Sequence, residues 1–433
     1  MARLVPPALD LHNVSAAHWT SLTKVIRQPE RYWPAVLLTQ PIITRRIGRR
    51  TLALIADPEA AKTILTGSEE EFPRPRLYQV GGLSGRDSLI ASSGRQWRRQ
   101  RRSFSAMFRP ETVSKLLPLY RRAIALAIAD WGGRPEPIRL DMSLEMMRLA
   151  MGIIWQALFG QCTDDALPPF VDDVAARIHA AQLRSEDNVV ARHVAELADA
   201  AQRRGPHRGI LQENPFNAWG AASGDPAQHG LTRKDFYDNA RLFLGAGHET
   251  VALTLSWAFW LVARDAQIQR RLHDEIDQVI DAGPIEAAHI ERLSFTGNVL
   301  NETLRLFAPG FVTVRRSRDP IVLAGERLPA STVLAVCIYA LHRHRQWWDE
   351  PDLFHPDRFG AGEPRHRYAF LPFSVGPRAC IGATFAWTEA VTIFASILQR
   401  FSVATDTTVP IKLRTGISLR PDHALPIVLH PRR

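Results

Sequence analysis

The sequence predicts a mainly α-helical protein that also contains small β-sheets. Apolar residues recur with helical spacing over most of the stretch from residue 111 to residue 306, and again over Ala383–Gln399. Short alternating segments, typical of strands, are confined to residues 50–56, 311–340 and the C-terminal part. With 433 residues, 45% of them hydrophobic, the chain can bury the core of one large domain or of two moderate ones.

The first 90 residues alternate between short elements and loops. Residues 1–50 mix short helical patterns with turns bounded by proline. The run Arg50–Ala56 is apolar and predicts a strand, and Asp57-Pro58 then turns the chain into a helix over Glu59–Leu65. Residues 72–90 predict a long loop, and loops of this length are often functional.

Helical periodicity runs through the stretch from residue 111 to residue 205. It predicts helices over Glu111–Trp131, Met142–Phe159, Phe170–Leu183 and Val189–Arg203. Residues 205–230 are rich in glycine and proline, so they predict a loop or a broken short helix rather than a clear domain boundary.

A long helix is predicted from Arg233 to Arg264, and its middle reads Leu244-Gly-Ala-Gly-His-Glu-Thr250. An interior glycine costs about 1 kcal/mol, so these two make room for a ligand against the helix or are ordinary packing glycines. Thr250 can bond the carbonyl four residues earlier. Glu249 beside it completes an acid–alcohol pair, which is a candidate proton relay. We interpret His248 as a polar or packing residue, because it has no His-x-x-x-His partner.

Gln267–Ile280 predicts another amphipathic helix, and a further helix contains Glu302 and Arg305. These two residues are three apart and can pair, and Arg358 is available as a second partner of Glu302 if the pair is buried. The predicted strands that follow are short: Phe311–Val314, Ile321–Leu323, Thr332–Ile338, Ile417–Leu419 and Pro426–Leu429.

The cysteine count and the apolar runs exclude several classes of protein. Cys162, Cys337 and Cys380 are far apart and odd in number, which argues against a disulfide framework and suits a reducing cytoplasm. They are too few for a four-cysteine iron–sulfur cluster or zinc ribbon. The N-terminus has no apolar run of signal-peptide length, and Val251–Ala263 is well short of the ~20 residues of a membrane span. We therefore expect a soluble protein.

A basic run, Gly94–Phe104, follows the long loop in a chain whose formal net charge is +10. Trp97 and Arg101 share one face of the predicted helix, where an indole N–H and a guanidinium can turn inward to a buried anion. The remaining arginines could face a nucleic acid, an acidic protein partner or only solvent. They are Arg95, Arg98, Arg99 and Arg102.

The stretch Phe370–Gly382 places Cys380 in a loop directly before a predicted helix. A thiol at a helix N-terminus feels the positive end of the helix dipole, which favours the thiolate. Gly376 and Gly382 allow a positive φ and a close approach of the backbone to a flat or bulky group. Arg378 adds a permanent cation. A buried thiolate in these surroundings needs an electrophilic partner, and a haem iron with its propionates is one such partner.

Four motifs make the chain resemble the cytochrome P-450 family of haem-thiolate monooxygenases over roughly residues 50–430. They occur in the family's order and with family-like spacing. Val251 stands where many members have a second hydroxyl, a position that varies. The motifs are the haem signature Phe373-x-x-Gly376-x-Arg378-x-Cys380-x-Gly382, the oxygen-activation motif Ala246-Gly247-x-Glu249-Thr250, the triad Glu302-x-x-Arg305 with Arg358, and the propionate helix Trp97-x-x-x-Arg101.

The resemblance implies the cytochrome P-450 fold, a triangular prism with a long central helix over the haem. It implies a single haem domain over residues 1–433. The β-rich part should comprise approximately residues 40–70, residues 311–340 and the C-terminal strands, and the α-rich haem core approximately residues 94–310 and 370–400.

The resemblance also implies heme b (iron protoporphyrin IX), with Cys380 as the metal ligand whose electron donation favours O–O cleavage. Thr250 and Glu249 would be the catalytic proton donors, and Glu302, Arg305 and Arg358 a folding element. The other implied cofactor contacts are Trp97, Arg101, Ala246, Phe373, Gly376, Arg378, Gly382 and one of Arg315 and Arg316, between which the register stays open.

By resemblance, the reaction takes O2 and two electrons and inserts one oxygen atom into a C–H bond or alkene of a hydrophobic small molecule, as in secondary metabolism. We expect no fused reductase, so electrons would come from a separate acidic ferredoxin or flavodoxin that docks on Arg98, Arg99 and Arg102. The lack of a membrane anchor matches soluble, bacterial-type members, and we expect a cytoplasmic enzyme without a nucleic-acid partner. The Glu-Thr-Leu-Arg and Leu-Pro-Phe-Ser stretches nevertheless resemble the branch shared with membrane-bound relatives.

An apolar substrate pocket is expected, although the sequence does not decide between terpenoid, fatty acid, polyketide and aromatic substrates. Ordinary core packing is the alternative for each candidate lining residue. The candidates are Leu77, Leu89, Ile90, Phe243, Leu244, Gly247, Val312, Val314 and Ile417.

Other functions are compatible with parts of this pattern. A peroxide-driven peroxygenase usually loses the acid–alcohol pair, which this chain keeps. A non-catalytic haem-binding protein would keep Cys380 but tolerate loss of that pair. Nucleic-acid binding through Arg95–Arg102 would predict salt-sensitive affinity.

Overall fold

The computed structural model describes residues 4–11, 21–75, 87–159, 169–184, 186–204, 231–280, 283–360, 366–405 and 408–432. The chain divides into two compact units. The first consists of Met1–Val80, Asn301–Cys380 and Pro410–Asp422, and the second of Gly81–Leu300, Ile381–Val409 and His423–Arg433. Within the described residues the sheets are small and helices predominate, so the predicted fold class is confirmed.

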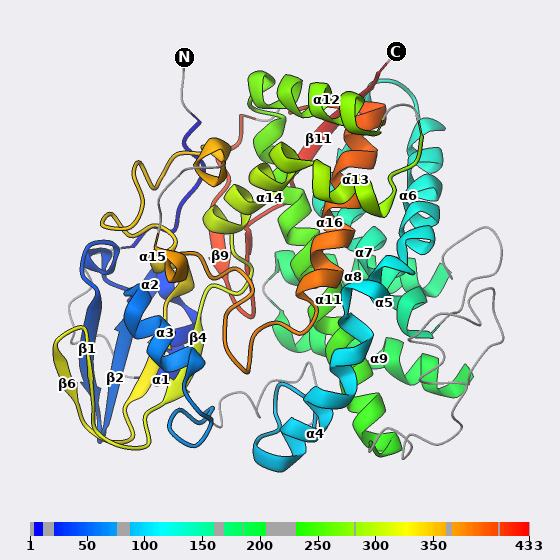
Figure 1. Cartoon of the computed structure of the whole chain (residues 1–433). Helices are drawn as coiled ribbons and strands as arrows, with labels where there is room; N and C mark the ends of the chain where they lie inside the picture. The colour runs from blue at the N-terminus through cyan, green and yellow to red at the C-terminus, as the bar shows by residue number, and fades with distance from the viewer. Residues whose placement is uncertain are drawn as a thin grey trace. The chain divides into compact units, whose positions relative to one another are not determined.

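The first unit is built on a four-stranded sheet with the order β1-β2-β7-β4 (Figure 1). The strands are β1 (Ile42–Ile47), β2 (Arg50–Ile55), β7 (Val333–Val336) and β4 (Thr313–Arg316). β2 runs parallel to β7, and the outer pairs are antiparallel. β7 is buried along its whole length, which its four apolar residues allow, whereas the edge strand β1 exposes its arginines.

A hydrophobic cluster lies on the face of this sheet that carries Ala53, Ile55 and Leu334. It includes residues of α3 (Pro58–Thr66), whose N-terminus is capped by Asp57 through its bond to the Ala60 N–H at 2.7 Å. The other described elements of the unit are short: α1 (Leu22–Arg27), α2 (Pro29–Tyr32), η2 (Ala35–Leu38), β5 (Ile321–Leu323), β6 (Glu326–Leu328), α15 (Ile338–Leu341), η7 (Pro356–Phe359), η8 (Arg367–Ala369), β9 (Leu413–Thr415) and β10 (Leu419–Pro421).

The strand predictions in this unit are partly confirmed. β2 and β5 lie where the apolar runs place them. The strand predicted at Phe311 begins two residues later, at Thr313, where the ladder with β7 starts. The prediction of a strand at Ile417 was wrong, because Ile417 lies in the turn that joins β9 to β10.

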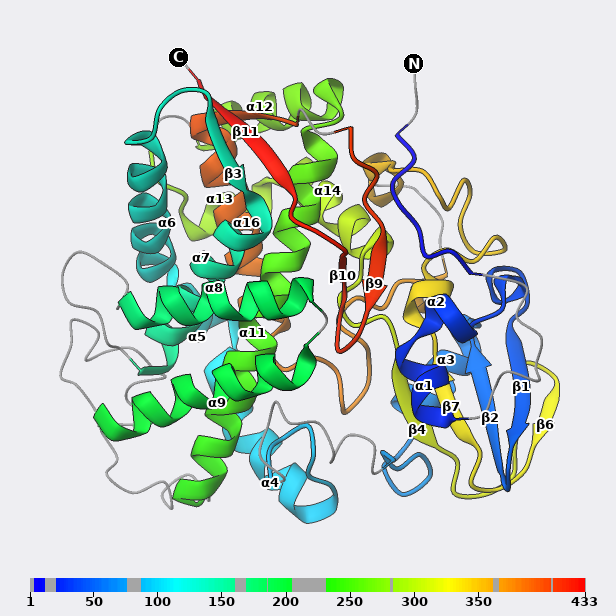
Figure 2. The ribbon, with the colours of Figure 1, turned by 180° about the vertical axis from the view of Figure 1, so that it is seen from behind.

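The second unit is mainly helical, and α11 (Arg233–Val262) packs along α7 (Met142–Phe159). A three-stranded antiparallel sheet belongs to it, with β11 (Pro426–Pro431) between β3 (Ile138–Asp141) and β8 (Phe401–Ala404) (Figure 2). Its other helices are α4 (Gly94–Ser105), η4 (Ala106–Phe108), α5 (Pro110–Ser114), α6 (Leu117–Gly132), α8 (Pro169–Leu183), α9 (Asp187–Arg204), α12 (Ala266–Ile280), α13 (Ala287–Arg292) and α16 (Ala383–Arg400). The boundary with the first unit falls inside α14 (Ser294–Leu306).

The long helices are predicted well. α7 has the predicted bounds, and α11 ends two residues before the predicted end. The helix predicted over Glu111–Trp131 is instead two helices, α5 and α6, because Pro118 lacks an N–H and favours a new start in the first turn of α6. No helix among the described residues is long and apolar enough to cross a membrane.

Candidate functional site

The loop that carries Cys380 is closed by its own backbone. The Cys380 N–H donates to the carbonyl of Phe373 at 2.9 Å, and the Ala379 N–H donates to that of Gly376 at 3.0 Å. Gly376 has a φ of +76°, and a Cβ there would lie 2.0 Å from the carbonyl oxygen of Leu65. Only glycine therefore fits at this close approach. The loop presents the Cys380 side chain at the surface of the protein chain, two residues before Gly382, the N-cap of α16.

His342 anchors this loop. Its Nε2 accepts the N–H of Leu371 at 2.8 Å, and its backbone carbonyl accepts a hydrogen bond from the Arg305 guanidinium at 2.9 Å. The side chain is fully buried. Burial, and then the neighbouring Arg305 charge, lower the pKa of His342 to about 3. The imidazole is therefore neutral near pH 7 and acts as an acceptor.

Arg378 belongs to a group of arginines that we call the open arginine cluster: Arg74, Arg315 and Arg378, with the carboxylate Glu69. Arg378 forms an ion pair with Glu69, and both side chains are largely buried. Burial, and then repulsion from Arg74 with a smaller contribution from Arg315, lower the pKa of Arg378 to about 10. The charges of Arg74 and Arg315 thus act on Arg378, which itself pairs with Glu69.

A second group, Glu302, Arg305 and Arg358, forms what we call the closed arginine cluster. Arg305 donates from Nε and Nη2 to the two carboxylate oxygens of Glu302 at 2.7 and 2.8 Å, and Arg358 Nε donates to Oε1 at 3.0 Å. All three side chains are buried. The pairs that the sequence predicts are therefore present in the structure.

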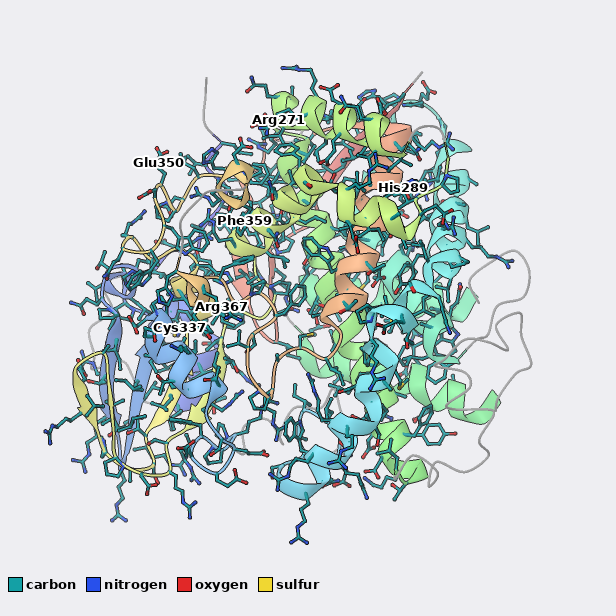
Figure 3. The ribbon with its side chains drawn as sticks, viewed as in Figure 1. Arg271, His289, Cys337, Glu350, Phe359 and Arg367 are labelled. Atoms are coloured by element: carbon teal, nitrogen blue, oxygen red, sulfur yellow. The ribbon has the colours of Figure 1, made fainter. Side chains whose placement is uncertain are left out.

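The remaining donors of the closed cluster bond to backbone carbonyls. Arg305 reaches the carbonyls of His342, Pro351 and Leu353 at 2.9, 2.7 and 3.0 Å. Arg358 reaches those of Asp349 and Glu350 at 3.0 and 3.3 Å, and Glu350 is labelled in Figure 3. Because these partners come from one long loop, the cluster fixes the path of the chain before the cysteine loop.

In the second unit, α4 carries the predicted pair of inward residues. Trp97 is buried and Arg101 is half-buried, on the same face of the helix. Arg95, Arg98 and Arg102 are exposed. Arg99, which the sequence analysis placed on the docking face, instead pairs with the buried Asp235 of α11 at 2.6 Å. That pair neutralises much of its charge.

The middle of α11 is an uninterrupted helix that carries the acid–alcohol pair. Thr250 Oγ1 donates to the carbonyl of Ala246 at 2.9 Å, as the sequence predicts for a hydroxyl at this position. Glu249 is buried, whereas Ala246 is exposed and Thr250 is partly exposed. One side of this turn therefore remains open within the unit.

Helix packing explains the glycine at position 247. A Cβ at this position would lie 3.2 Å from Cγ1 of Ile154 in α7, so the glycine lets the two helices approach closely. Of the two readings of the glycines, helix packing therefore accounts for Gly247, and its predicted place in a substrate pocket has no support from this geometry. His248 is also a packing residue: it is fully buried, its Nδ1 lies at 2.5 Å from the carbonyl of Leu244, and burial lowers its pKa to about 4.

Comparisons with known proteins decide the family. The family model "Cytochrome P450" matches residues 38–181 and 187–427. The chain belongs to the cytochrome P-450 family. Cyclooctatin synthase of Streptomyces melanosporofaciens is 28% identical, over 91% of this chain and 89% of that protein. Pentalenene oxygenase of Streptomyces avermitilis is 27% identical, over 95% and 92%. Thromboxane-A synthase of Sus scrofa is 26% identical, over 90% and 86%.

Membership of the cytochrome P-450 family establishes an oxidoreductase of the monooxygenase class, whose cofactor is heme b with a cysteine thiolate ligand and which uses O2, a substrate and a redox partner. The residues of the first unit fit this group. The open arginine cluster brings the charges of Arg74 and Arg315 to Arg378, and guanidinium groups bind carboxylates such as propionates well. The cysteine thiol is exposed, and Gly376 lets the loop backbone pack tightly behind it.

The structure distinguishes Arg315 from Arg316, whose register the sequence leaves open. Both lie on β4, but Arg315 is buried and Arg316 is exposed. The Arg315 guanidinium acts on Arg378 electrostatically and donates to the Val314 carbonyl at 3.0 Å. Arg315 is therefore the member of the pair that belongs to the open arginine cluster.

The candidate pocket residues differ in how far the structure buries them. Leu77 lies outside the described residues. Leu244 is fully buried, and core packing accounts for it, whereas Ile417 is exposed in its turn. The others stay predictions: Leu89, Phe243 and Val314 are buried, and Ile90 and Val312 are half-buried.

Sequence reasoning missed Arg74, Glu69 and His342. Arg74 and Glu69 lie in or near the loop after α3, far in sequence from Arg378. The one available signal was the Phe-Pro-Arg-Pro-Arg run in a loop of functional length. No sequence pattern indicated His342, because its role as a neutral hydrogen-bond acceptor depends on its burial in the folded protein.

Proposed function

We propose that this protein inserts one oxygen atom from O2 into a hydrophobic small molecule, by hydroxylation or epoxidation, with electrons from a separate acidic ferredoxin or flavodoxin. The observation that carries the proposal is the presence, within one unit, of the exposed Cys380 thiol and of the open arginine cluster, in which the charges of Arg74 and Arg315 act on Arg378. A thiolate ligand and propionate partners are the two things that haem needs from a protein.

Cys380 is the proposed iron ligand, and Arg315 and Arg378 of the first unit, with Trp97 and Arg101 of the second, are the proposed partners of the propionates. When bound, the haem supplies the activation of O2, which the thiolate ligand favours. Gly376 and the Phe373–Cys380 hydrogen bond hold the sulfur in a fixed loop, so that little entropy is lost when the ligand bond forms.

Thr250 and Glu249 are the proposed proton donors. Thr250 Oγ1 already has an acceptor, the Ala246 carbonyl, so the hydroxyl is oriented within its own helix turn. Glu249 directly precedes Thr250 in the sequence, and its side chain is buried. Its carboxyl group is the proposed source of a proton that passes through the hydroxyl. The intact pair favours O2 chemistry over a peroxide-driven reaction.

The basic face of α4 is the proposed docking surface for the acidic electron carrier. Arg95, Arg98 and Arg102 are exposed along this helix, and the formal net charge is +10. Complementary charge raises the rate of encounter with an acidic protein. Arg99 contributes less, because it is paired with Asp235.

The decisive experiment is spectroscopic. The reduced, CO-treated holoprotein should show a Soret band near ~450 nm, the signature of thiolate-ligated haem, and Cys380→Ser should abolish it. Cys337→Ser is the matched control, because that thiol is fully buried beside β7 and donates to the Ala335 carbonyl (Figure 3). A band that survives in the Cys380 variant, or that is absent from the native protein, would refute the proposal.

Turnover separates the reaction types. Pentalenene, named as the substrate of one relative, is a reasonable first probe in a screen of apolar compounds for ligands that shift the haem spectrum. With a converted substrate, Thr250→Ala should lower the fraction of electrons that end in product. Turnover with peroxide and none with electron carriers would show a peroxygenase, and unchanged coupling in the variant would remove the role of Thr250.

A further inference from the structure

The first turns of α11 carry a buried carboxamide, Asn239, with both of its ends in use. Its Oδ1 accepts the N–H of Leu89 at 2.7 Å, and its Nδ2 donates to the carbonyl of Asp235 at 2.7 Å. The side chain has no exposed surface. Since a backbone N–H must donate and a carbonyl must accept, these two bonds fix the orientation of the amide. The main chain at Leu89 is thereby attached to α11.

Asp235 connects α4 to the same end of α11. Its carboxylate accepts hydrogen bonds from Gln100 of α4 at 2.9 Å and from Arg99 at 2.6 Å, and it takes part in the capping box of α11 with Thr232. Gln100, which is fully buried, also donates to the carbonyl of Asp87 at 2.5 Å. We call Gln100, Asp235 and Asn239 the α11 clasp.

The clasp lies on the face of α11 that leads to the acid–alcohol pair. Asn239, Phe243, Ala246 and Thr250 follow one another at intervals of four, three and four residues, so they share one side of the helix. Along the axis, Asn239 and Thr250 are ~16 Å apart at 1.5 Å per residue. A rigid helix therefore carries both the anchor of Leu89 and the proposed proton donor.

We propose that Asn239 is a positioning residue for substrate recognition, which fixes Leu89 and Ile90 relative to Thr250 and so sets which bulky apolar substrates are accepted. This proposal rests on the proposed function, in which Leu89 and Ile90 line the substrate pocket. Asn239 does not touch the substrate. It acts through the main chain of residue 89, whose displacement would change the shape of the pocket without changing its composition.

The clasp differs from the exposed ion pairs beside it. Lys234 links Asp87 and Asp238, with its Nζ at 2.7 Å from Asp238, but its side chain is 65% exposed. Exposed pairs of this kind contribute little. The buried, neutral bond to the Leu89 N–H is a contact of a different kind, because its loss removes an acceptor from a buried N–H group.

The test compares two azoles on the holoenzyme. Imidazole occupies only the immediate surroundings of the iron, whereas 4-phenylimidazole also reaches the pocket wall. Asn239→Leu keeps the branched shape of the side chain and removes both hydrogen bonds. We expect the Kd of 4-phenylimidazole to rise about tenfold, equivalent to about 1.4 kcal/mol, and the Kd of imidazole to stay within about twofold. Lys234→Gln is the matched control and should change neither value.

The outcomes separate this proposal from the proposed function. A parallel change for both azoles, or no change for either, overturns the role of Asn239 while the imidazole-induced shift still shows a haem enzyme. Failure of native protein to bind imidazole at all would instead refute the proposed function.

A measurement on the native holoenzyme needs no variant. The Leu89 amide should exchange with solvent deuterium as slowly as the interior amides of α11. Exchange at the rate of an exposed loop amide would overturn the proposal, even if Asn239→Leu does not fold.

Discussion

The first unit contains two arginine clusters of different character. In the closed cluster, two guanidinium groups surround Glu302, and the remaining donors reach backbone carbonyls. In the open cluster, Arg378 pairs with Glu69, and the charges of Arg74 and Arg315 act on Arg378. The closed cluster is thus characterised by hydrogen bonds to one central carboxylate, and the open cluster by repulsion between its guanidinium groups.

This difference shows how to tell a scaffold from a ligand site. Buried cations are tolerated when carboxylates and carbonyls satisfy them, and a cluster saturated in that way has no need of a further partner. In the open cluster, burial and then repulsion from Arg74 lower the pKa of Arg378. Such repulsion is relieved by an anion, so the open cluster is where an anionic group of the cofactor is expected.

Removing the carboxylate of the closed cluster should have the largest effect. Glu302→Gln leaves Arg305 and Arg358 buried without a counter-charge, and we expect the free energy of unfolding to fall by about 3–5 kcal/mol. Denaturant unfolding of the native and variant proteins measures the difference. Glu326→Gln is the control, because Glu326 is exposed and its carboxylate accepts a hydrogen bond from the neutral hydroxyl of Thr44 at 3.2 Å. A loss below about 1 kcal/mol for Glu302→Gln would show that the closed cluster is not the scaffold.

His342 links the closed cluster to the cysteine loop, and its effect on stability should depend on pH. Its carbonyl accepts from Arg305 of the closed cluster, and its imidazole accepts from the loop that leads to Cys380. The pKa is about 3 in the folded protein against 6.5 ordinarily, so below pH 6.5 the unfolded chain binds one more proton. The stability that the neutral imidazole contributes is therefore fully present above pH 6.5. As the pH is lowered from 6.5 to about 3, the free energy of unfolding decreases by about 1.4 kcal/mol per pH unit.

The variant His342→Gln isolates that contribution. A glutamine keeps an acceptor for the Leu371 N–H but does not titrate. Its unfolding free energy should therefore fall less steeply than that of the native protein between pH 6.5 and pH 4.5, a window above the folded pKa of about 3. His430→Gln, at an exposed position, serves as the control. Identical slopes for the native protein and His342→Gln would contradict the assignment.

The sequence predicts the closed cluster better than the open one. Glu302 and Arg305 are three apart on one helix, and Arg358 belongs to the same motif, so the pairing is visible before the fold is known. Arg74 and Glu69 approach Arg378 only because α3 packs on the sheet and brings the following loop back to residue 378. Contacts of that kind follow from tertiary packing, which no local pattern contains.

The same contrast holds for the fold. α7 and α11 are predicted nearly to the residue, because long periodic segments carry a strong signal. β1 lies in the expected β-rich part but was not predicted as a strand from its own pattern, because its sequence Ile-Ile-Thr-Arg-Arg-Ile has exposed arginines where an edge strand meets solvent. Asn239 was missed for a related reason, since one asparagine in a helix gives no sign that it bonds a loop residue 150 positions away.

The smallest effect is expected from substitutions on β4, where Arg315 belongs to the open cluster and its neighbour Arg316 does not. Arg315→Gln removes a buried cation, and Arg316→Gln removes an exposed one from the same strand. We expect haem to dissociate about tenfold faster from the Arg315 variant, because a charge-assisted bond contributes about 1.5–3 kcal/mol, and at the native rate from the Arg316 variant. Transfer of haem to apomyoglobin measures both rates.

Since Arg315 adds repulsion rather than support, Arg315→Gln should leave the stability of the apoprotein within about 1 kcal/mol of native, in contrast to Glu302→Gln. Equal rates of haem loss from the two variants would contradict the assignment of Arg315 to the cofactor site. A large loss of apoprotein stability in Arg315→Gln would contradict the proposed difference between the two clusters.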